Sequence, residues 1–323
     1  MKRFLSALTA SVLMLLLLPV SALARELLIP AGDLIGLQLR DDTVTIAAFD
    51  EILGAQAQRA GLQIGDRLLA INGRAVRNAE DVKTLLQQSS PDAVTLTVSR
   101  GSKRREIRMP PLADAHNPRL GVYLRQGVSG IGTVTWYDPA TRRFGTLGHG
   151  VSGPNGILAP MREGSIYPAV ITAVEPGTSG HPGYLKGSAD STQCMGVLLK
   201  NTPQGVFGKA SLDFRGEPLP VAQFAEIHTG AAQIRSTVSG NSPREYSVEI
   251  LKIYPETRQD CRNFLLRVTD PTLLSLTGGI VQGMSGSPVI QDGRIVGAVT
   301  HVMVSDPTTG YGIFIGNMLD AAA

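Results

Sequence analysis

Features that would point to several common classes of protein are scarce in this sequence. Its formal net charge is only +3 over 323 residues, and Lys2 and Arg3 supply two of those charges, so nothing in the composition favours nucleic-acid binding. No pair of histidines or cysteines has the spacing of metal ligands, and neither a metal ion nor another cofactor is expected. The two cysteines, Cys194 and Cys261, could pair or stay separate, since a sequence does not give their separation. We find no internal repeat and no low-complexity segment.

The N-terminal segment 1–24 has the layout of an export signal. A basic start precedes an apolar stretch at 8–20, and small residues follow at 21–24 in the order Ser-Ala-Leu-Ala. This order predicts recognition by signal peptidase. The stretch 5–23 is nearly long enough to span a bilayer, so an uncleaved anchor is the alternative. In either case we expect the remainder to be exported across the cytoplasmic membrane, as a soluble or an anchored protein.

What is abundant favours β-structure and two domains. Apolar residues make up 43% of the chain, and 36 glycines and 20 prolines separate many short runs of Val, Ile, Thr and Leu. The length and apolar content suffice for two cores. Three prolines among polar residues at 109–118 predict a linker. We therefore expect a first domain at 32–112, a linker at 113–118 and a second domain at 119–323.

The first domain is predicted to combine short strands with two helices. Apolar alternation and turn signals predict strands at 34–39, 43–46, 94–98 and 103–107. A short helix at 55–60 would be closed by Gly61, and a second would begin after Asn78, which can cap it.

One string in this domain is specific. The residues AGLQIGDRLLAING at 60–73 resemble the PDZ domains of bacterial exported proteases, and the resemblance covers 32–112. In that family a strand after a glycine-containing loop pairs with the C-terminus or an extended segment of a peptide. The resemblance therefore implies a peptide-binding role for the matching positions, which are Leu34, Ile35, Gly36 and Leu37.

The second domain contains the string GMSGSP at 283–288, followed by two short strands. An α/β-hydrolase elbow would need a glycine at position 287 and a helix after it, and the sequence has neither. A Gly-x-Ser-Gly-x-Pro loop instead suits a nucleophile of the chymotrypsin type. Ser285 is then the predicted nucleophile, and the N–H groups of Gly283 and Ser285 are the predicted oxyanion hole.

A serine nucleophile needs a base within hydrogen-bond reach. His149 lies between glycines in the string GTLGHGV at 145–151, a setting that suits an accessible imidazole at a strand end. His301 lies in an apolar strand, where a half-buried structural role is favoured. The remaining histidines are expected in the linker or in surface turns, and they are His116, His181 and His228.

The third member of a triad would be a carboxylate that orients the imidazole. Asp270 ends an apolar strand ahead of the Ser285 loop. Asp138 and Asp306 are also followed by proline, and both suit turns. The order His, Asp, Ser along the chain is equally satisfied by Asp190, Asp213 and Asp260. The residues alone therefore do not choose the carboxylate.

Several strings together resemble the stage IV sporulation protein B peptidase family. They are IGTVTWYDP at 131–139, LGHG at 147–150, VTD at 268–270, TGGIVQGMSGSP at 277–288 and GAVTHV at 297–302. The resemblance implies a mainly β protein in which a PDZ domain precedes a chymotrypsin-like double β-barrel peptidase domain. It also implies that His149, Asp270 and Ser285 form the catalytic triad.

The resemblance implies a biological role as well. Members of that family are secreted from the forespore into the space between the two membranes of a developing spore. They cleave a membrane-bound regulator, which releases sigma factor processing, and they cleave themselves near the N-terminus. The implied partners are a protein substrate, a peptide or C-terminus at the PDZ domain, and a second copy for cleavage in trans. The alternatives are a non-catalytic peptide-binding scaffold, an esterase with the same triad, and a related peptidase with another exported substrate.

Overall fold

The computed structural model describes residues 27–90, 92–111, 118–153, 156–258 and 260–323. The predicted export signal at 1–24 and most of the predicted linker lie outside these ranges, as does His116. Within the described residues, no helix is long and apolar enough to cross a membrane.

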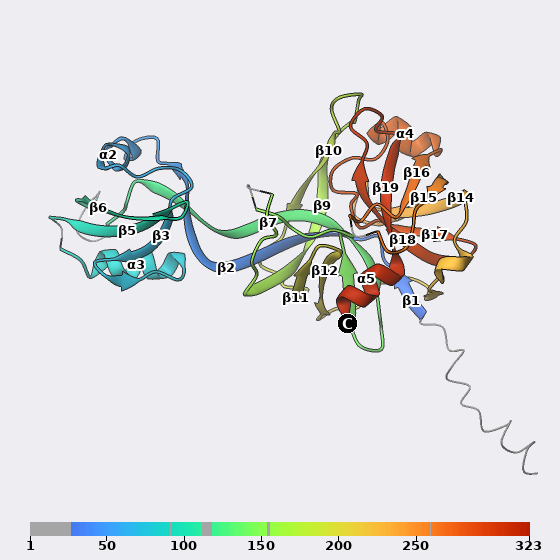
Figure 1. Cartoon of the computed structure of the whole chain (residues 1–323), viewed down its shortest axis with the longest axis horizontal. Coiled ribbons are helices and arrows are strands. Elements are labelled where there is room, and N and C mark those ends of the chain that lie inside the picture. The colour runs from blue at the N-terminus through green and yellow to red at the C-terminus, as the bar shows by residue number, and fades with distance from the viewer. Residues whose placement is uncertain (1–26, 91, 112–117, 154–155, 259) are drawn as a thin grey trace, which may run out of the picture.

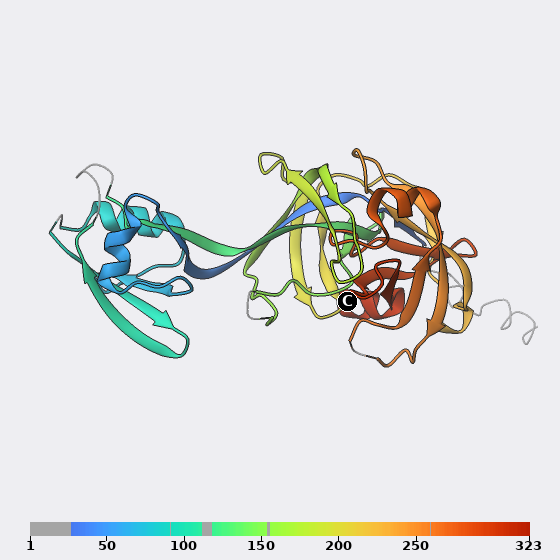
Figure 2. The same cartoon turned by 90° about the horizontal axis from the view of Figure 1, so that it is seen from above.

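The chain forms a small domain that two long strands connect to a pair of β-barrels (Figure 1). The connecting strands are β2, Leu34–Phe49, and β7, Val122–Tyr137, which pair with each other along most of their length. Figure 2 shows the same ribbon of two strands from above. The chain enters the small domain along β2 and returns to the barrels along β7.

The first barrel closes through six strands. In order of pairing these are β2, β7, β8 (Arg143–Thr146), β12 (Gly205–Ala210), β11 (Gly196–Thr202) and β9 (Glu163–Glu175), and β9 pairs back to β2. Strands at its margins are β1 (Leu27–Pro30), β13 (Leu219–Pro220) and β10 (Tyr184–Ala189). Side chains from β2, β7, β8 and β9 fill its interior, including Ile35, Tyr137, Phe144 and Ile166, which are fully buried.

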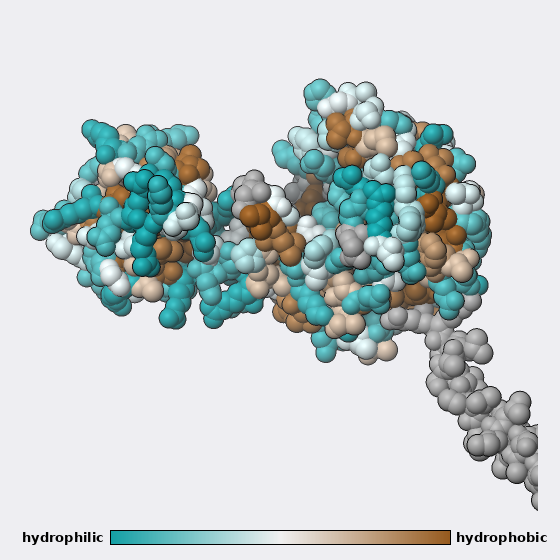
Figure 3. All heavy atoms as spheres, in the orientation of Figure 1, coloured by the Kyte–Doolittle hydropathy of each residue, from teal (hydrophilic) through white to brown (hydrophobic). Residues whose placement is uncertain are grey.

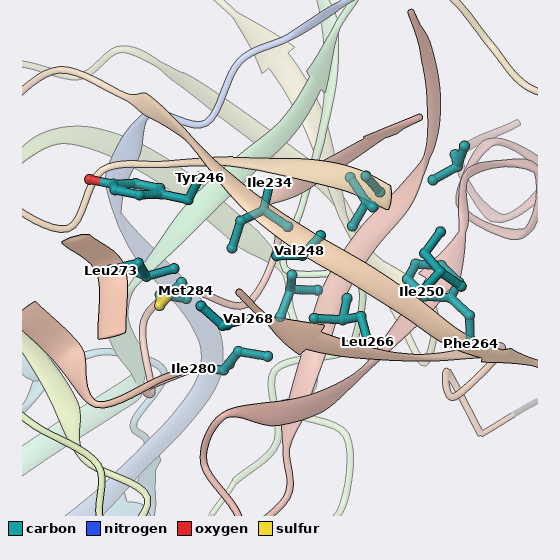
Figure 4. Packing of buried hydrophobic residues seen from close by; sticks show 14 of the residues in the cluster. Ile234, Tyr246, Val248, Ile250, Phe264, Leu266, Val268, Leu273, Ile280 and Met284 are labelled. Carbon is teal, nitrogen blue, oxygen red and sulfur yellow. The ribbon is translucent and has the colours of Figure 1, made fainter. Parts of the chain in front are cut away.

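The second barrel is also closed and six-stranded. Its strands, in order of pairing, are β14 (Gly230–Ser236), β15 (Arg244–Ile253), β16 (Phe264–Val268), β19 (Thr309–Phe314), β18 (Arg294–Val302) and β17 (Pro288–Gln291). Figure 4 shows its core, in which Ile234, Val248 and Phe264 pack together. The 3-10 turn η2 (Phe224–Glu226) precedes it, α4 (Pro271–Thr277) follows β16, and α5 (Ile315–Ala322) ends the chain. Two six-stranded barrels confirm the predicted chymotrypsin-like fold class.

The small domain comprises residues 41–111 and 120–126 and has its own core. Its elements, besides the ends of β2 and β7, are α2 (Gly54–Ala60), β3 (Arg67–Ile71), β4 (Arg74–Ala75), α3 (Ala79–Gln87), β5 (Val94–Arg100) and β6 (Lys103–Met109). Both helices form where the sequence predicts them. Gly61 closes α2 in a left-handed conformation, and the Asn78 side chain accepts a hydrogen bond from Asp81 N–H at the start of α3.

The predicted peptide-binding strand lies in the wrong domain for that role. Residues 34–40 pair on one side with β7 and on the other side with β9, so both edges of this strand carry ladder hydrogen bonds inside the first barrel. Leu34, Ile35 and Leu37 are buried there. A Cβ atom on Gly36 would lie 2.4 Å from the Cβ of Ala189, because β10 packs on this position. The prediction that these four residues bind peptide is therefore wrong.

Domain limits differ from the prediction for the same reason. Residues 27–40 belong to the first barrel, whereas a start of the small domain at 32 was expected. Residues 120–126, beyond the predicted linker, complete the sheet and core of the small domain. The small domain is thus inserted between two strands of a barrel and does not simply precede it.

Candidate active site

Ser285 lies on the loop between α4 and β17, and the core of the second barrel anchors this loop. Met284 is fully buried beside Ser285, and Ile280 is buried four residues earlier. Figure 4 shows both side chains pointing into the core with Leu273 of α4. Within the loop, Met284 N–H donates to the Val281 carbonyl over 3.1 Å and Ser287 N–H donates to the Met284 carbonyl over 2.9 Å. The position of Ser285 is therefore set by buried neighbours on both sides.

The first barrel holds the same loop from the opposite side through β7. Thr133 N–H donates to the Ser285 carbonyl over 3.2 Å, and the Thr133 hydroxyl donates to the Gly283 carbonyl over 3.0 Å. The Thr135 hydroxyl donates to the Gly286 carbonyl over 2.7 Å. Both threonines are fully buried, so these bonds are shielded from water. Ser285 therefore lies at the contact between the two barrels.

Gly286 shows why the loop needs glycine after the serine. Its φ is +96°, a conformation that residues with a side chain rarely adopt. A Cβ atom there would also lie 2.1 Å from the Thr133 carbonyl oxygen and 2.5 Å from Leu147 N. The loop consequently packs directly on the backbone that leads to His149.

His149 comes after β8, and the two residues just before it adopt the left-handed conformation. Leu147 has φ +70° and Gly148 has φ +67°, and a non-glycine residue in this region stores strain that is frequent at functional sites. A Cβ atom on Gly148 would lie 2.8 Å from Thr300 Cγ2, so the turn presses against β18. Nδ1 of His149 lies 3.0 Å from the Gly150 carbonyl oxygen. A carbonyl only accepts, so Nδ1 carries the proton and the lone pair is on Nε2.

Ser285 and His149 both contact the same stretch of β18. The Ser285 hydroxyl donates to the Thr300 carbonyl over 2.9 Å. The His149 ring centroid lies 5.6 Å from that of His301, the next residue along β18. Among the described residues, no hydrogen bond joins Ser285 to His149 directly. The structure thus brings the predicted nucleophile and base to one place, with the serine hydroxyl bound to a backbone carbonyl.

The two predicted oxyanion donors have free N–H groups. Met284, Gly286 and Ser287 each donate their N–H to a backbone carbonyl. Gly283 and Ser285, which alternate with them, donate theirs to no acceptor in the described part of the chain. An oxyanion hole needs donors that are not already engaged, and these two meet that requirement.

Asp270 lies elsewhere and has a structural function. Its carboxylate accepts hydrogen bonds from the N–H groups of Thr272 (2.9 Å) and Leu273 (3.0 Å), which makes Asp270 the N-cap of α4. The register places Leu265 and His301 opposite the same residue, Tyr311. Asp270 lies beyond the end of β16, where its N–H donates to the Ser247 carbonyl, and no hydrogen bond among the described residues joins it to His149. The structure therefore does not bring Asp270 to His149. An Asp-Pro pair before a helix is a typical capping signal, which the sequence contained.

The other acidic candidates do not replace it. In the described residues, none of them is hydrogen-bonded to His149. Asp190 binds Thr192 and Gln193, Asp213 binds the Tyr137 hydroxyl, and Asp260 pairs with Arg258. The role of the third residue, which holds Nδ1–H, falls to the Gly150 carbonyl in this structure.

We expect Asp270→Asn to leave the activity of Ser285 nearly unchanged. Asparagine caps a helix about as well as aspartate, whereas Asp270→Ala should cost about 1 kcal/mol of the free energy of unfolding. Urea unfolding and the rate of fluorophosphonate labelling of Ser285 would measure the two effects. A loss of about 10⁴-fold in a folded Asp270→Asn variant, the size seen when a triad aspartate is amidated, would instead return Asp270 to the triad.

The pH dependence should reflect the burial of His149. Removal from water lowers the pKa of His149 below its ordinary value, and the hydrogen bond to Gly150 only partly offsets this. The neutral ring, which is the form that accepts a proton, therefore persists to lower pH. The labelling rate of Ser285 should begin to fall only below about pH 6.5, the usual pKa of histidine. A midpoint at or above that value would show that His149 is not the titrating base.

Comparison with known proteins assigns the larger part of the chain to one protein family. Residues 116–319 match the family described as SpoIVB peptidase S55, and residues 53–100 match the PDZ domain. The chain belongs to the SpoIVB peptidase S55 family. It also carries a PDZ domain, which is the small domain.

The curated proteins that this chain resembles match only part of it. The chain is 34% identical over 77 residues to the putative zinc metalloprotease Atu1380 of Agrobacterium fabrum. This match covers 24% of this chain and 20% of that protein. It is 23% identical over 141 residues to a putative zinc metalloprotease of Treponema pallidum, covering 41% of this chain and 31% of that protein. This chain thus spans between a fifth and a third of the length of these curated relatives.

Two solved structures are also similar. The Rv3671c protease from M. tuberculosis in its active form is 17% identical, with a TM-score of 0.36, over 61% of this chain and 73% of that chain. The PDZ domain of the SdrC-like protein Lmo2051 from Listeria monocytogenes is 19% identical, with a TM-score of 0.23, over 26% of this chain and 87% of that chain.

Proposed function

We propose that this chain is an exported serine endopeptidase in which Ser285 is the nucleophile and His149 the general base. The observation that carries this proposal is the position of Ser285. It lies on a loop bound by both barrels, close to the His149 imidazole. Within the described part of the chain, Nε2 of that ring and the N–H groups of Gly283 and Ser285 have no hydrogen-bond partner. These are the parts that acyl transfer to serine needs.

The free edge of β18 is suited to hold the substrate. β17 pairs with β18 as far as Ala298, and Val299 bonds to the Ser285 loop. Beyond Val299, no strand in the described residues pairs with this edge, while β19 occupies the other edge. An extended peptide can add there as a strand. A substrate N–H would then donate to the Thr300 carbonyl in place of the Ser285 hydroxyl, which frees that hydroxyl for His149.

The reaction then follows from the positions of the groups. Ser285 Oγ attacks the peptide carbonyl carbon while His149 Nε2 takes the hydroxyl proton. The N–H groups of Gly283 and Ser285 donate to the resulting oxyanion. The C–N bond breaks as His149 returns the proton to the leaving amine, and an acyl-enzyme remains. Water, deprotonated by His149, then attacks the acyl carbon, and the bond from that carbon to Ser285 Oγ breaks as His149 returns the proton to Oγ.

The proposed substrate is a membrane-associated regulatory protein, together with the N-terminal part of the chain itself. Family membership supports this role in sporulation signalling, upstream of sigma factor processing, and the signal at 1–24 supports export to the space between the forespore membranes. Self-cleavage in trans would require two copies to meet. A related peptidase with a different exported substrate is the second candidate, since the matches to curated proteins cover only part of their length.

Self-cleavage tests the proposed activity without knowledge of the substrate. The purified chain and its Ser285→Ala variant would be incubated side by side, and the N-termini of any fragments would be sequenced. We expect fragments from the unmodified chain only. Identical fragments from both proteins would show that another protease makes them, and the proposal of self-cleavage would fail. Fluorophosphonate labelling of Ser285 distinguishes a peptidase from a non-catalytic scaffold.

We further propose that peptide recognition uses the edge of β7 beside α3. Among the described residues, 122–126 pair with β2 on one side only, and α3 contacts β7. A cleft of about 1020 Å³ opens beside them and extends to the first barrel; its lining includes Thr84 of α3, Leu124 of β7, and Arg162 of the first barrel. Addition of a strand at such an edge is how PDZ domains bind peptides. Figure 3 shows that the face of this domain turned to the viewer is mostly hydrophilic.

Thr84 offers a direct test of this groove. Thr84→Tyr should fill the groove and slow cleavage of a protein substrate by about tenfold or more, equivalent to about 1.4 kcal/mol, while labelling of Ser285 stays normal. Thr84 is exposed, so the PDZ domain should still fold. Lys83→Tyr is the matched control, because Lys83 is exposed on the same helix and does not line the cleft. Equal cleavage by both variants would place recognition outside this groove.

A further inference from the structure

His301 has no part in the proposed mechanism, yet its side chain lies against the proposed base. The ring centroids of His149 and His301 are 5.6 Å apart and the ring planes are inclined by 44°. Nδ1 of His301 is shielded from solvent and has no hydrogen-bond partner among the described residues. A buried polar atom without a partner is costly in a folded protein. Such an atom beside a second imidazole is a place where a ligand can be bound.

Both rings present a nitrogen that can bind a metal ion. Nδ1 of His149 donates to the Gly150 carbonyl, and histidines that bind metals typically use their other ring N–H in this way. Nε2 of His149 and Nδ1 of His301 are then the two nitrogens available. A ring nitrogen binds a metal ion through a lone pair, and the hydrogen bond from Nδ1 to Gly150 leaves that of His149 on Nε2.

We infer that His149 and His301 together bind a divalent transition-metal ion such as Zn²⁺, which inhibits the peptidase. An ion at about 2.1 Å from one nitrogen of each imidazole places the ring centroids roughly 5 to 6 Å apart, and the observed separation falls in that range. Imidazole suits Zn²⁺, Cu²⁺ and Ni²⁺ and disfavours Mg²⁺ and Ca²⁺, which prefer oxygen ligands.

The surroundings indicate reversible binding. The described residues contain no group of three or more His, Cys, Asp or Glu side chains that could hold a metal, so water or the Ser285 hydroxyl would complete the coordination. The positive charge of Arg262 acts on His301 and opposes a cation, while the negative charge of Asp260 favours one. An ion on His149 Nε2 occupies the lone pair that would take the Ser285 proton. This inhibition rests on the proposed function, whereas the binding itself does not.

Calorimetric titration tests the binding without any need for activity. ZnCl₂ would be titrated into the full chain carrying Ser285→Ala, and one Zn²⁺ per chain is expected. Adding His301→Gln should abolish this heat, and MgCl₂ should produce none. His228→Gln is the matched control, because His228 is exposed and pairs with Asp292 at the surface. Undiminished binding after His301→Gln in a variant with a normal melting temperature, or loss of binding with His228→Gln alone, would overturn the inference.

A labelling assay then tests whether the bound metal ion inhibits the peptidase. Zn²⁺ should slow fluorophosphonate labelling of Ser285 in the unmodified chain, and EDTA should restore the rate. In His301→Gln, the ratio of the rates with and without Zn²⁺ should be close to one, whatever rate the variant retains. If Ser285 never labels but the titration depends on His301, the metal site stands and the proposed peptidase activity fails. If labelling is normal and Zn²⁺ neither binds nor inhibits, the metal site fails alone.

Discussion

Replacing Ser285 with alanine should abolish both fluorophosphonate labelling and cleavage of peptide bonds, with a loss of about 10⁶-fold, as found when the nucleophile of a serine protease is removed. The substitution deletes one hydroxyl, whose sole hydrogen bond in the described structure goes to the Thr300 carbonyl. The loop should keep its shape, since Met284, Thr133 and Thr135 hold it through other atoms. Labelling with a fluorescent fluorophosphonate and circular dichroism would measure activity and folding.

Ser287 provides the matched control for this experiment. Its hydroxyl is fully buried, 2.9 Å from the Ser236 hydroxyl and 2.7 Å from the Met284 carbonyl oxygen. Ser287→Ala should therefore lower the free energy of unfolding by about 1 to 3 kcal/mol, because it leaves a buried hydroxyl without its partner. Substantial labelling should remain. Equal loss of labelling in the two variants would make the assignment of the nucleophile unsafe.

Replacing His149 with alanine should reduce activity as severely as Ser285→Ala, because the nucleophile and its base act as a unit. His301→Ala should retain measurable turnover, since no hydrogen bond among the described residues joins the His301 side chain to Ser285. Initial rates of labelling and of self-cleavage would compare the two variants. Activity close to that of the unmodified chain in His149→Ala, together with loss in His301→Ala, would transfer the role of base to His301.

The hydrogen bond from Ser285 to Thr300 bears on how the enzyme is controlled. A serine hydroxyl that donates to a backbone carbonyl cannot give its proton to His149 at the same time. Strand addition of a substrate at β18 supplies a competing donor to that carbonyl. β7 also forms the edge of the proposed peptide groove at 122–126 and binds the Ser285 loop through Thr133 and Thr135. One continuous strand thus connects the proposed recognition site with the proposed catalytic site.

Residues 34–37 show that sequence periodicity can predict a strand but not the strands that pair with it. The alternating pattern correctly predicts a strand, and its apolar side chains are buried. The pattern cannot name the neighbouring strands, because ladder hydrogen bonds use backbone groups that nearly every residue has. The PDZ resemblance of residues 60–73 implied a peptide-binding role for this strand, but β7 and β9 occupy both of its edges. The free edge next to α3 comes instead from residues beyond the predicted linker.

Asp270 shows that the sequence also cannot decide between a catalytic and a structural role for a side chain. Chain order and family resemblance favour it as the third member of the triad, and its local sequence equally suits an N-cap. The helix α4 was not predicted, since seven residues with one proline give little periodic signal. In the structure the carboxylate binds the first N–H groups of that helix. Two roles compete for one side chain, and only the position of the helix separates them.

The sequence by itself determined the family, the PDZ domain, the class of fold and the nucleophile loop as a motif. These depend on local signals, such as glycine at left-handed positions and short strings with specific neighbours. Only the tertiary structure decided which groups meet: Ser285 at the Thr300 carbonyl, His149 beside His301, and β7 beside α3. Those contacts join segments far apart in the chain across two barrels, and they arise from how the strands close and pack, which no local pattern encodes.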